Sequence, residues 1–447
     1  MQGQRIGASG EDRITILPES LLSHILSFLT TKDSVRTSVL SSRWRNLWLW
    51  VSKLDLDTCD FSEVNTCWSF VDKFMNFRGE YSSVLLGFKL HTHHDVDENS
   101  PLEASLTRVV KRKIQHFEID NNFGFCILLS PLIFSVSDTL VTLKLSFVIL
   151  SEFEFCTLPC LEIMHLNKVI FPSDEAAEAL ISSSPVLMEL EMTHGRFDYV
   201  QVLRVRSASL KSLTLKRADP DDFENGGGHE VVIHTPRLEY LSLKDYQYRS
   251  FEIVSVSETV EVDVDVVFEA IGGNIGALME RNIICNFLTR VSNIRDMTMS
   301  RRTLEFIYHY LEMNPLFKFH ELARLRVTMF LNSSPKMLPV ILETSPNLKF
   351  LTLELVHDSL VTKGRSRLLT LLPRCLLSSL ESVYIESPIT RKATELKLVR
   401  YFLENSATLK KLVLRLNQST GERHEPGVLK QLFESPRCSS LCQFVIL

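Results

Sequence analysis

A short apolar pattern, apolar-x-x-apolar-x-apolar, returns along almost the whole chain of 447 residues. Most steps between successive copies are 21 to 32 residues long, which is the spacing of a repeat protein. The step from Leu238 to Ile294 is 56 residues, twice 28, so a degenerate copy is expected near Val260-Val262-Val264. The fourteen clear copies are Val51-Leu54-Leu56, Leu85-Phe88-Leu90, Ile114-Phe117-Ile119, Leu140-Leu143-Leu145, Leu161-Met164-Leu166, Leu187-Leu190-Met192, Leu210-Leu213-Leu215, Leu238-Leu241-Leu243, Ile294-Met297-Met299, Leu322-Leu325-Val327, Leu348-Leu351-Leu353, Leu380-Val383-Ile385, Leu409-Leu412-Leu414 and Leu441-Phe444-Ile446.

This pattern predicts a solenoid of short parallel strands. In each copy the last two apolar residues are two apart, so their side chains point to one face of a strand. One strand cannot bury that face alone, whereas stacked copies form a continuous core. Helix-like segments lie between copies, for example after the capping residue Ser173 and over residues 395–403. The expected fold class is α/β, an irregular solenoid with parallel strands on its concave face. Fourteen near-regular copies argue against the alternative, a set of unrelated α/β domains.

Residues 17–48 differ from the repeats and are predicted to form three short amphipathic helices. The first begins after Pro18, the second is capped by Thr31 and the third by Ser41. A unit of this size buries too little surface to be stable alone, so its second apolar face must meet the rest of the chain or another protein. The alternative is an ordinary helical cap on the repeats. The apolar positions of the three helices are Leu21, Leu22, Ile25, Leu26 and Leu29, then Val35, Val39 and Leu40, then Trp44, Leu47 and Trp48.

These N-terminal residues resemble an F-box, and the whole chain resembles the plant F-box/FBD/leucine-rich-repeat proteins. The resemblance implies that the helices bind a Skp-type adaptor, which docks on a cullin scaffold with a RING subunit. It implies that the repeats hold a protein for ubiquitination. The matching residues are Leu17-Pro18, Leu21-Leu22, Ile25-Leu26-Ser27, Leu29, Lys32-Asp33, Thr37-Ser38-Val39-Leu40-Ser41, Arg43-Trp44-Arg45 and Leu47-Trp48.

From Leu372 to the end, the chain resembles the FBD region of the same family. Its sequence fits two further strand repeats with a helix between them, so it is expected to continue and cap the solenoid. The predicted organisation is a disordered N-terminus (residues 1–11), an F-box (12–58), the repeat solenoid (59–371) and the FBD region (372–447). The matching residues include Pro373-Arg374-Cys375-Leu376, Leu380-Glu381, Tyr401-Phe402-Leu403, Leu409-Lys410-Lys411-Leu412 and Ser435-Pro436.

Two sets of residues are candidates for binding. The resemblance assigns the first set to adaptor contact or to the packing behind it: Leu17, Pro18, Leu21, Ile25, Leu26, Leu29, Val39, Leu40, Trp44, Leu47 and Trp48. The second set is predicted to face away from the core of the repeats and to contact a substrate: Glu189, Glu191, Tyr240, Arg324, Arg326, Phe350 and Tyr384. The pattern predicts that this surface is acidic at 189–191, is basic at 324–326 and ends in an apolar column that includes Val413 and Val445. The alternative is that the chain's own C-terminal cap covers this column.

Composition and motifs exclude several classes of function. The net charge is −5 with no long block of one sign, which argues against nucleic-acid and membrane-surface binding. No run of apolar residues is long enough to span a membrane, so a soluble chain is expected. The cysteines lack zinc-ligand spacing, and His91, His93 and His94 lie in a polar stretch for which a solvated turn is the interpretation favoured over a metal site. No catalytic motif is present, so neither a cofactor nor enzyme chemistry is expected.

The predicted function is substrate recognition within an SCF-type E3 ubiquitin ligase, which acts by raising the concentration of the target near a charged conjugating enzyme. The expected partners are the adaptor and an unknown protein substrate, and the expected location is the nucleus, the cytoplasm or both. A repeat scaffold without ligase function is the alternative. A small-molecule sensor, which leucine-rich-repeat hormone receptors with F-boxes suggest, is disfavoured because their pocket residues have no counterparts that can be placed on this chain.

Overall fold

The computed structural model divides into two compact units, residues 1–187 and 188–447, which are described separately. The predicted disordered segment, residues 1–11, lies outside the described part. The residues described are 14, 16–78, 85–93, 101–121, 127–130, 134, 138–151, 157–195, 199–217, 229–244, 248–255, 257, 259–266, 285–313, 317–330, 337–356, 372–387, 393–416 and 433–447.

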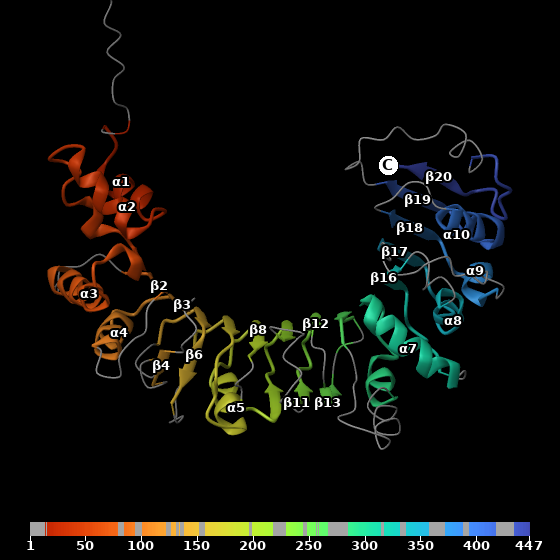
Figure 1. The fold of residues 1–447 in the computed structure, drawn as a ribbon, viewed down its shortest axis with the longest axis horizontal. Helices are drawn as coiled ribbons and strands as arrows, with labels where there is room; N and C mark the ends of the chain where they lie inside the picture. Colours follow the sequence, from red (N-terminus) through yellow and green to blue (C-terminus); the bar gives the residue numbers. More distant parts are fainter. Residues whose placement is uncertain are drawn as a thin grey trace, which may run out of the picture. The chain divides into compact units, whose positions relative to one another are not determined.

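The first unit begins with a helical segment, residues 17–50, made of α1 (Glu19–Leu26), α2 (Thr31–Arg36), η1 (Thr37–Val39) and η2 (Leu47–Trp50) (Figure 1). The prediction that Thr31 caps the second helix is wrong by one residue: the Thr30 side chain accepts the Asp33 N–H at 3.2 Å. The predicted third α-helix is also wrong, because residues 42–50 form turns and the 3₁₀ helix η2. Trp44, in these turns, and Leu47, the first residue of η2, both enter the core.

The repeats of the first unit form a parallel sheet in which β1, β2, β3, β5 and β7 pair in chain order. Helices lie in the connections, and Ser173 caps α5 as predicted, since its hydroxyl accepts the Ala176 N–H at 3.3 Å. The bounds are β1 Lys53–Asp57, η3 Thr58–Asp60, α3 Val64–Arg78, β2 Gly87–Thr92, α4 Leu102–Val110, β3 His116–Asn121, β4 Ile127–Leu129, β5 Thr142–Ser146, β6 Val148–Leu150, β7 Ile163–Asn167 and α5 Asp174–Ser182. Strands β4 and β6 pair separately.

The second unit continues the same design, with β8, β10, β12 and β14 to β20 parallel and in chain order. Between β8 and β14 the returning chain forms β9, β11 and β13, a separate parallel sheet. Residues 285–291 are helical. The bounds are β8 Glu189–His194, β9 Val202–Arg206, β10 Ser212–Arg217, β11 His229–His234, β12 Tyr240–Lys244, β13 Tyr248–Ser255, β14 Glu261–Val264, β15 Asp296–Met299, α7 Arg301–Met313, β16 Arg324–Phe330, α8 Leu338–Glu343, β17 Phe350–Val356, α9 Arg374–Ser378, β18 Ser382–Ser387, α10 Ala393–Asn405, β19 Lys411–Leu416 and β20 Gln443–Ile446.

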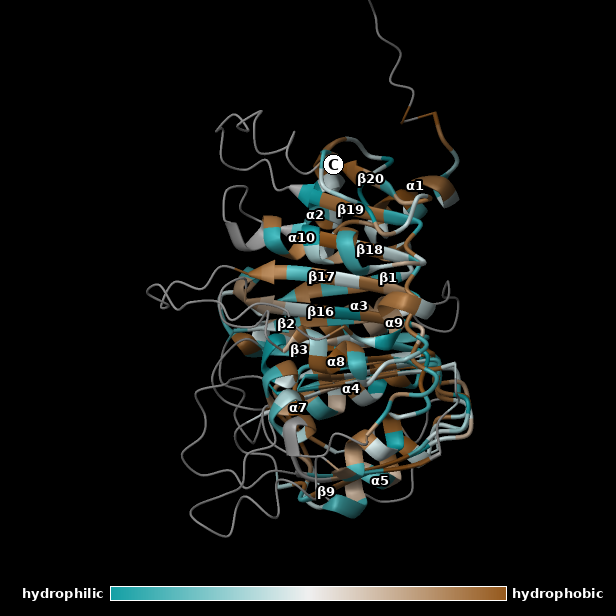
Figure 2. Cartoon of the chain, turned by 90° about the vertical axis from the view of Figure 1, so that its right-hand side faces the viewer, coloured by the Kyte–Doolittle hydropathy of each residue, from teal (hydrophilic) through white to brown (hydrophobic). Residues whose placement is uncertain are grey.

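The apolar positions of the sequence pattern occupy equivalent register positions and form the core. In the second unit, Leu190 pairs with Leu213, which pairs with Leu241. All three side chains are buried. The degenerate copy is confirmed: Val262 pairs with Leu241 on one side and with Met297 on the other. Apolar and polar colours alternate along β17 (Figure 2), as the two-residue period of a strand requires. The predicted α/β fold with stacked parallel strands is therefore confirmed.

Among the described helices, none is both long enough and apolar enough to cross a lipid bilayer.

Candidate functional site

The helical segment has a small core of its own. Leu22 and Leu26, one turn apart on α1, are buried against Trp44, Leu47 and Val51. This core uses one face of α1, and Leu17 packs against its edge. Two hydrogen bonds join parts of the segment that are separated in sequence. The buried Ser34 hydroxyl donates to the Leu26 carbonyl at 3.0 Å, and Arg43 donates to the Leu17 carbonyl.

The other face of α1 and the turn of η1 expose apolar side chains to solvent. Leu21, Ile25 and Phe28 follow one another at i, i+4 and i+7, and Phe28 is 78% exposed. Val39 and Leu40, at the end of η1, are 85% and 66% exposed. Apolar colour runs along α1 in Figure 2. Clusters of this kind mark binding surfaces. We call this set the apolar face: Leu21, Ile25, Phe28, Leu29, Val39 and Leu40.

The helical segment is fastened to the first repeat. The Trp48 ring stacks on the rings of Phe70 and Phe74 in α3, with centroid distances of 5.9 and 6.0 Å. Thr31, 4% exposed, accepts the backbone N–H of Asp55 in β1 at 2.8 Å. Since these contacts use other side chains, they leave the apolar face open.

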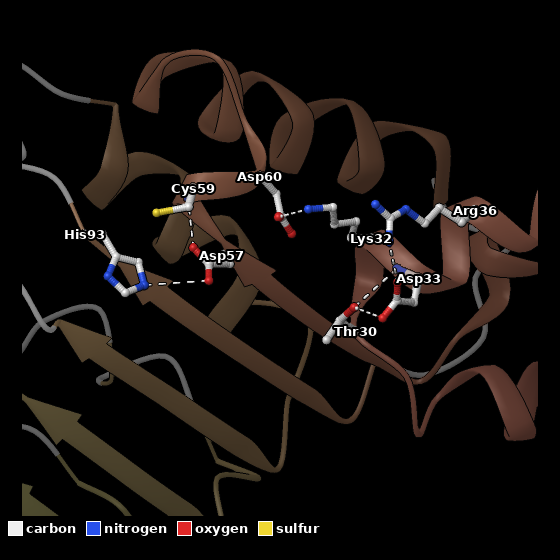
Figure 3. Close-up of polar contacts among 8 residues, drawn as sticks. All are labelled: Thr30, Lys32, Asp33, Arg36, Asp57, Cys59, Asp60 and His93. Carbon is white, nitrogen blue, oxygen red and sulfur yellow. Dashed lines mark hydrogen bonds and ion pairs between the residues drawn. The ribbon is translucent and has the colours of Figure 1, made fainter.

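An ion pair joins α2 to the end of β1. Lys32 Nζ donates to Asp60 in η3, the short helix that follows β1 (Figure 3). This pair is a second contact, beside the Thr31 hydrogen bond, between α2 and the chain around β1.

A second candidate surface follows two rows of the sheet in the second unit. Each row consists of residues that pair across successive strands. The pairing register divides the predicted substrate residues between the two rows, with their side chains on the face opposite the core. The first row contains Glu189, Tyr240, Arg324 and Phe350, and the second contains Glu191, Arg326 and Tyr384.

Most charges predicted for this surface are paired across strands. Lys216 Nζ lies 2.6 Å from Glu191 Oε1, and Arg324 Nη1 lies 3.1 Å from Asp296 Oδ2. Arg324 also lies over the Phe350 ring, 5.7 Å from its centroid. The predicted change from acidic to basic is therefore largely offset by neighbouring charges.

The apolar end of this surface differs from the prediction at one residue. Val413 is only 3% exposed, although its register position between Tyr384 and Val445 is as predicted. Phe350 and Tyr384 remain about one-third exposed, at 37% and 36%. The surface therefore offers two separated aromatic rings and no continuous apolar column.

Comparison with known proteins gives three domain matches along the chain. An F-box domain model matches residues 14–56, a model described as "FBD-associated F-box protein At5g56370, LRR repeats" matches residues 102–262, and an FBD model matches residues 370–414. The chain is 70% identical to the FBD-associated F-box protein At5g18780 of Arabidopsis thaliana over 447 residues, which is 100% of both chains. It is 54% identical to the F-box/FBD/LRR-repeat protein At5g18770 of the same plant, over 98% of this chain and 92% of the relative.

The chain belongs to the plant F-box/FBD/leucine-rich-repeat family.

Within the F-box, the structure divides the predicted adaptor residues into two groups. Leu26, Trp44 and Leu47 are buried in the F-box core, so these three act as packing in this conformation, and the partly buried Trp48 packs on α3. Leu17 is half-buried. The predicted residues that lie open to solvent are Pro18, Leu21, Ile25, Leu29, Val39 and Leu40.

Sequence reasoning missed four exposed apolar side chains of the F-box region: Ile14, Ile16, Phe28 and Trp50. The i, i+4, i+7 spacing from Leu21 could have identified Phe28. Trp50 borders a cavity of about 510 Å³ beside α1 that also has Glu19, Ser23 and His24 in its wall. No periodicity marks Ile14, Ile16 or Trp50, since they lie outside regular helix.

Burial keeps two thiols of this chain in the protonated form. Burial raises the pKa of the Cys67 thiol to about 12, and burial likewise raises the pKa of Cys375 to about 12. Both thiols are therefore protonated at neutral pH, and a protonated thiol is a poor nucleophile.

Proposed function

We propose that this chain is the substrate-recognition subunit of an SCF-type E3 ubiquitin ligase. The observation that supports this most directly is the apolar face of α1 and η1, which stays open to solvent although Leu22, Leu26, Trp44 and Leu47 form a packed core behind it. In this proposal a Skp-type adaptor covers the apolar face and connects the chain to a cullin and its RING subunit. Membership of an F-box family agrees with this assignment.

The apolar face suits a preformed binding surface. Its helix is held from behind by Leu22 and Leu26, so docking an adaptor does not require α1 to fold or rearrange. A surface ordered in advance loses less conformational entropy on binding, which favours affinity. Val39, Phe28 and Leu40 are the most exposed side chains of the apolar face and are the best candidates for strong contacts.

The chain contributes no catalysis in this proposal. It holds a protein substrate on the repeats, so that the conjugating enzyme meets a high local concentration of target lysine. The two rows that include Tyr240, Arg326 and Tyr384 are the proposed contact surface for that substrate. The proposed location is the nucleus, the cytoplasm or both. The proposed function involves neither a nucleic-acid partner nor a membrane.

An adaptor-binding measurement tests this proposal. Full-length chain with Val39→Glu and Leu40→Glu is compared with the wild-type chain for capture of a purified Skp-type adaptor. The two carboxylates would be desolvated in the interface, so we expect affinity to fall by at least about 100-fold. The matched control is Leu128→Glu, an equally apolar and exposed position on β4, which should bind normally.

Circular dichroism melting shows whether each variant folds. Folded wild-type chain that does not bind adaptor would contradict the proposal and favour a repeat scaffold without ligase function. Equal binding by the Val39→Glu/Leu40→Glu variant and the wild type would show that the apolar face is not the docking surface.

A further inference from the structure

Three side chains with metal-binding donors meet where β1 and β2 end. Asp57 is the last residue of β1, Cys59 lies in η3, and His93 follows β2 directly. Their ligand atoms all lie within 4.8 Å of one another. Figure 3 shows the thiol, the carboxylate and the imidazole around one space. The group lies in the first unit and contains no residue of the apolar face.

The backbone holds these three residues in place. The Cys59 N–H donates to Asp57 Oδ1 at 2.8 Å, which fixes the carboxylate. The His93 N–H donates to the Thr58 hydroxyl at 3.1 Å, and Thr58 is completely buried. A buried side chain therefore anchors the end of β2 to η3, and the ligand atoms remain on the accessible side.

The distance between the carboxylate and the imidazole fits a bridging ion better than a direct bond. Asp57 Oδ2 lies 3.6 Å from His93 Nε2, which is too long for a hydrogen bond. Two oxygen or nitrogen ligands of a tetrahedral zinc ion lie about 3.3 Å apart, and a sulfur ligand lies about 3.6 Å from either. Because all three donors lie within 4.8 Å of one another, no separation needs to shorten by more than about 1.5 Å to reach these values.

We propose that Asp57, Cys59 and His93 bind one divalent ion of the zinc class and leave its fourth position open. A thiolate and an imidazole select such an ion over magnesium or calcium, which prefer oxygen ligands only. Cys59 loses its proton to solvent when the ion binds, so binding releases a proton and weakens as the pH falls. The sequence pattern favours a solvated turn over a metal site around His93, and it does not group His93 with Asp57 and Cys59. His94, named with His91 and His93 as a possible metal ligand, lies outside the described residues.

The ion would stiffen the attachment of the F-box. It would fasten η3 to the end of β2, and Asp60 of η3 is the partner of Lys32 in α2. Binding to the folded chain alone raises the midpoint of thermal unfolding. The inference does not depend on adaptor binding, since its measurements use the isolated full chain.

Cobalt(II) titration of chelator-treated full-length chain tests the site. We expect one equivalent to bind with a thiolate-to-cobalt charge-transfer band, which zinc displaces. Cys59→Ser should abolish the band, and His93→Ala should weaken binding by at least about tenfold, as removal of a metal-site residue does. Asp57→Asn should also weaken binding, although it keeps the oxygen that accepts the Cys59 N–H.

Two control variants make the test specific. Cys160→Ser removes another exposed thiol of the first unit. His91→Ala removes the preceding histidine, whose Nδ1 lies 3.2 Å from Asp120 Oδ2. Both should bind cobalt as the wild type does. The absence of a charge-transfer band in folded wild-type chain, or a normal band in Cys59→Ser, would overturn the proposal.

Discussion

The Thr31 hydroxyl accepts a hydrogen bond from the backbone N–H of Asp55, and this bond joins the F-box helix α2 to β1, the first strand of the sheet. β1 pairs with β2 on one side. Thr31 therefore satisfies a backbone donor at the open edge of the sheet, where an unpaired group would otherwise be exposed to strand addition.

Replacing Thr31 with Val should destabilise the chain. Valine keeps the shape of threonine but leaves the Asp55 N–H without its acceptor in a partly buried place, at a cost of about 1–3 kcal/mol in the free energy of unfolding. Thr31→Ser keeps the hydroxyl and should cost less. Urea unfolding measures both variants. Equal stability of Thr31→Val and wild type would show that the bond does not hold the junction.

Replacing Trp48 with Ala should loosen the F-box without removing its binding surface. The variant loses the stack on Phe70 and Phe74, and because Trp48 is only partly buried we expect a cost of about 1–3 kcal/mol, below that of a fully buried aromatic residue. Hydrogen exchange should accelerate over residues 17–50 and remain slow in β16 to β19. Accelerated exchange throughout the second unit as well would contradict a local role.

Replacing Arg326 with Ala should change stability by less than about 1 kcal/mol. Arg326 donates to Glu386 at 3.0 Å and lies 3.5 Å from Glu354, but these pairs are solvent-exposed and screened by salt. Thermal melting at low and high salt measures the effect. A loss above about 2 kcal/mol would mean that the pairs are structural, and Arg326 would then be a poor choice for testing substrate binding.

Thiol alkylation should separate the cysteines by burial. Cys67 and Cys375, with pKa values raised to about 12, should stay unmodified by iodoacetamide at pH 7.5 while the exposed Cys160 and Cys438 react. Raising the pH toward 9 should still leave Cys67 and Cys375 unmodified, because burial keeps both thiols protonated below about pH 12. Peptide mass spectrometry measures each site. Rapid labelling of Cys375 would contradict its burial in the FBD region.

The repeat core was predictable because its signal is local and periodic. Val262 illustrates this: strand alternation and the doubled step placed it correctly even though its copy lacks leucine. The choice between Thr30 and Thr31 as helix cap was not predictable, since both are threonines and the buried bond to Asp55 decides which one turns inward.

Contacts between residues far apart in the chain could not be predicted from the sequence pattern. Trp48 has the spacing of a helix face, and only the position of Phe70 and Phe74 shows that it packs within the chain. Val413 is predicted to face outward, yet it is buried at its register position. The predicted domain limits, 12–58, 59–371 and 372–447, stay predictions, because family matches over 14–56, 102–262 and 370–414 do not define where each domain ends.

Hydrogen exchange of the full chain with and without a purified Skp-type adaptor tests the central claim most directly. The account predicts slower exchange over α1 and η1 when adaptor is bound, with β8 to β20 unchanged. Adaptor binding with no added protection of α1 and η1, or with protection confined to the repeats, would contradict it.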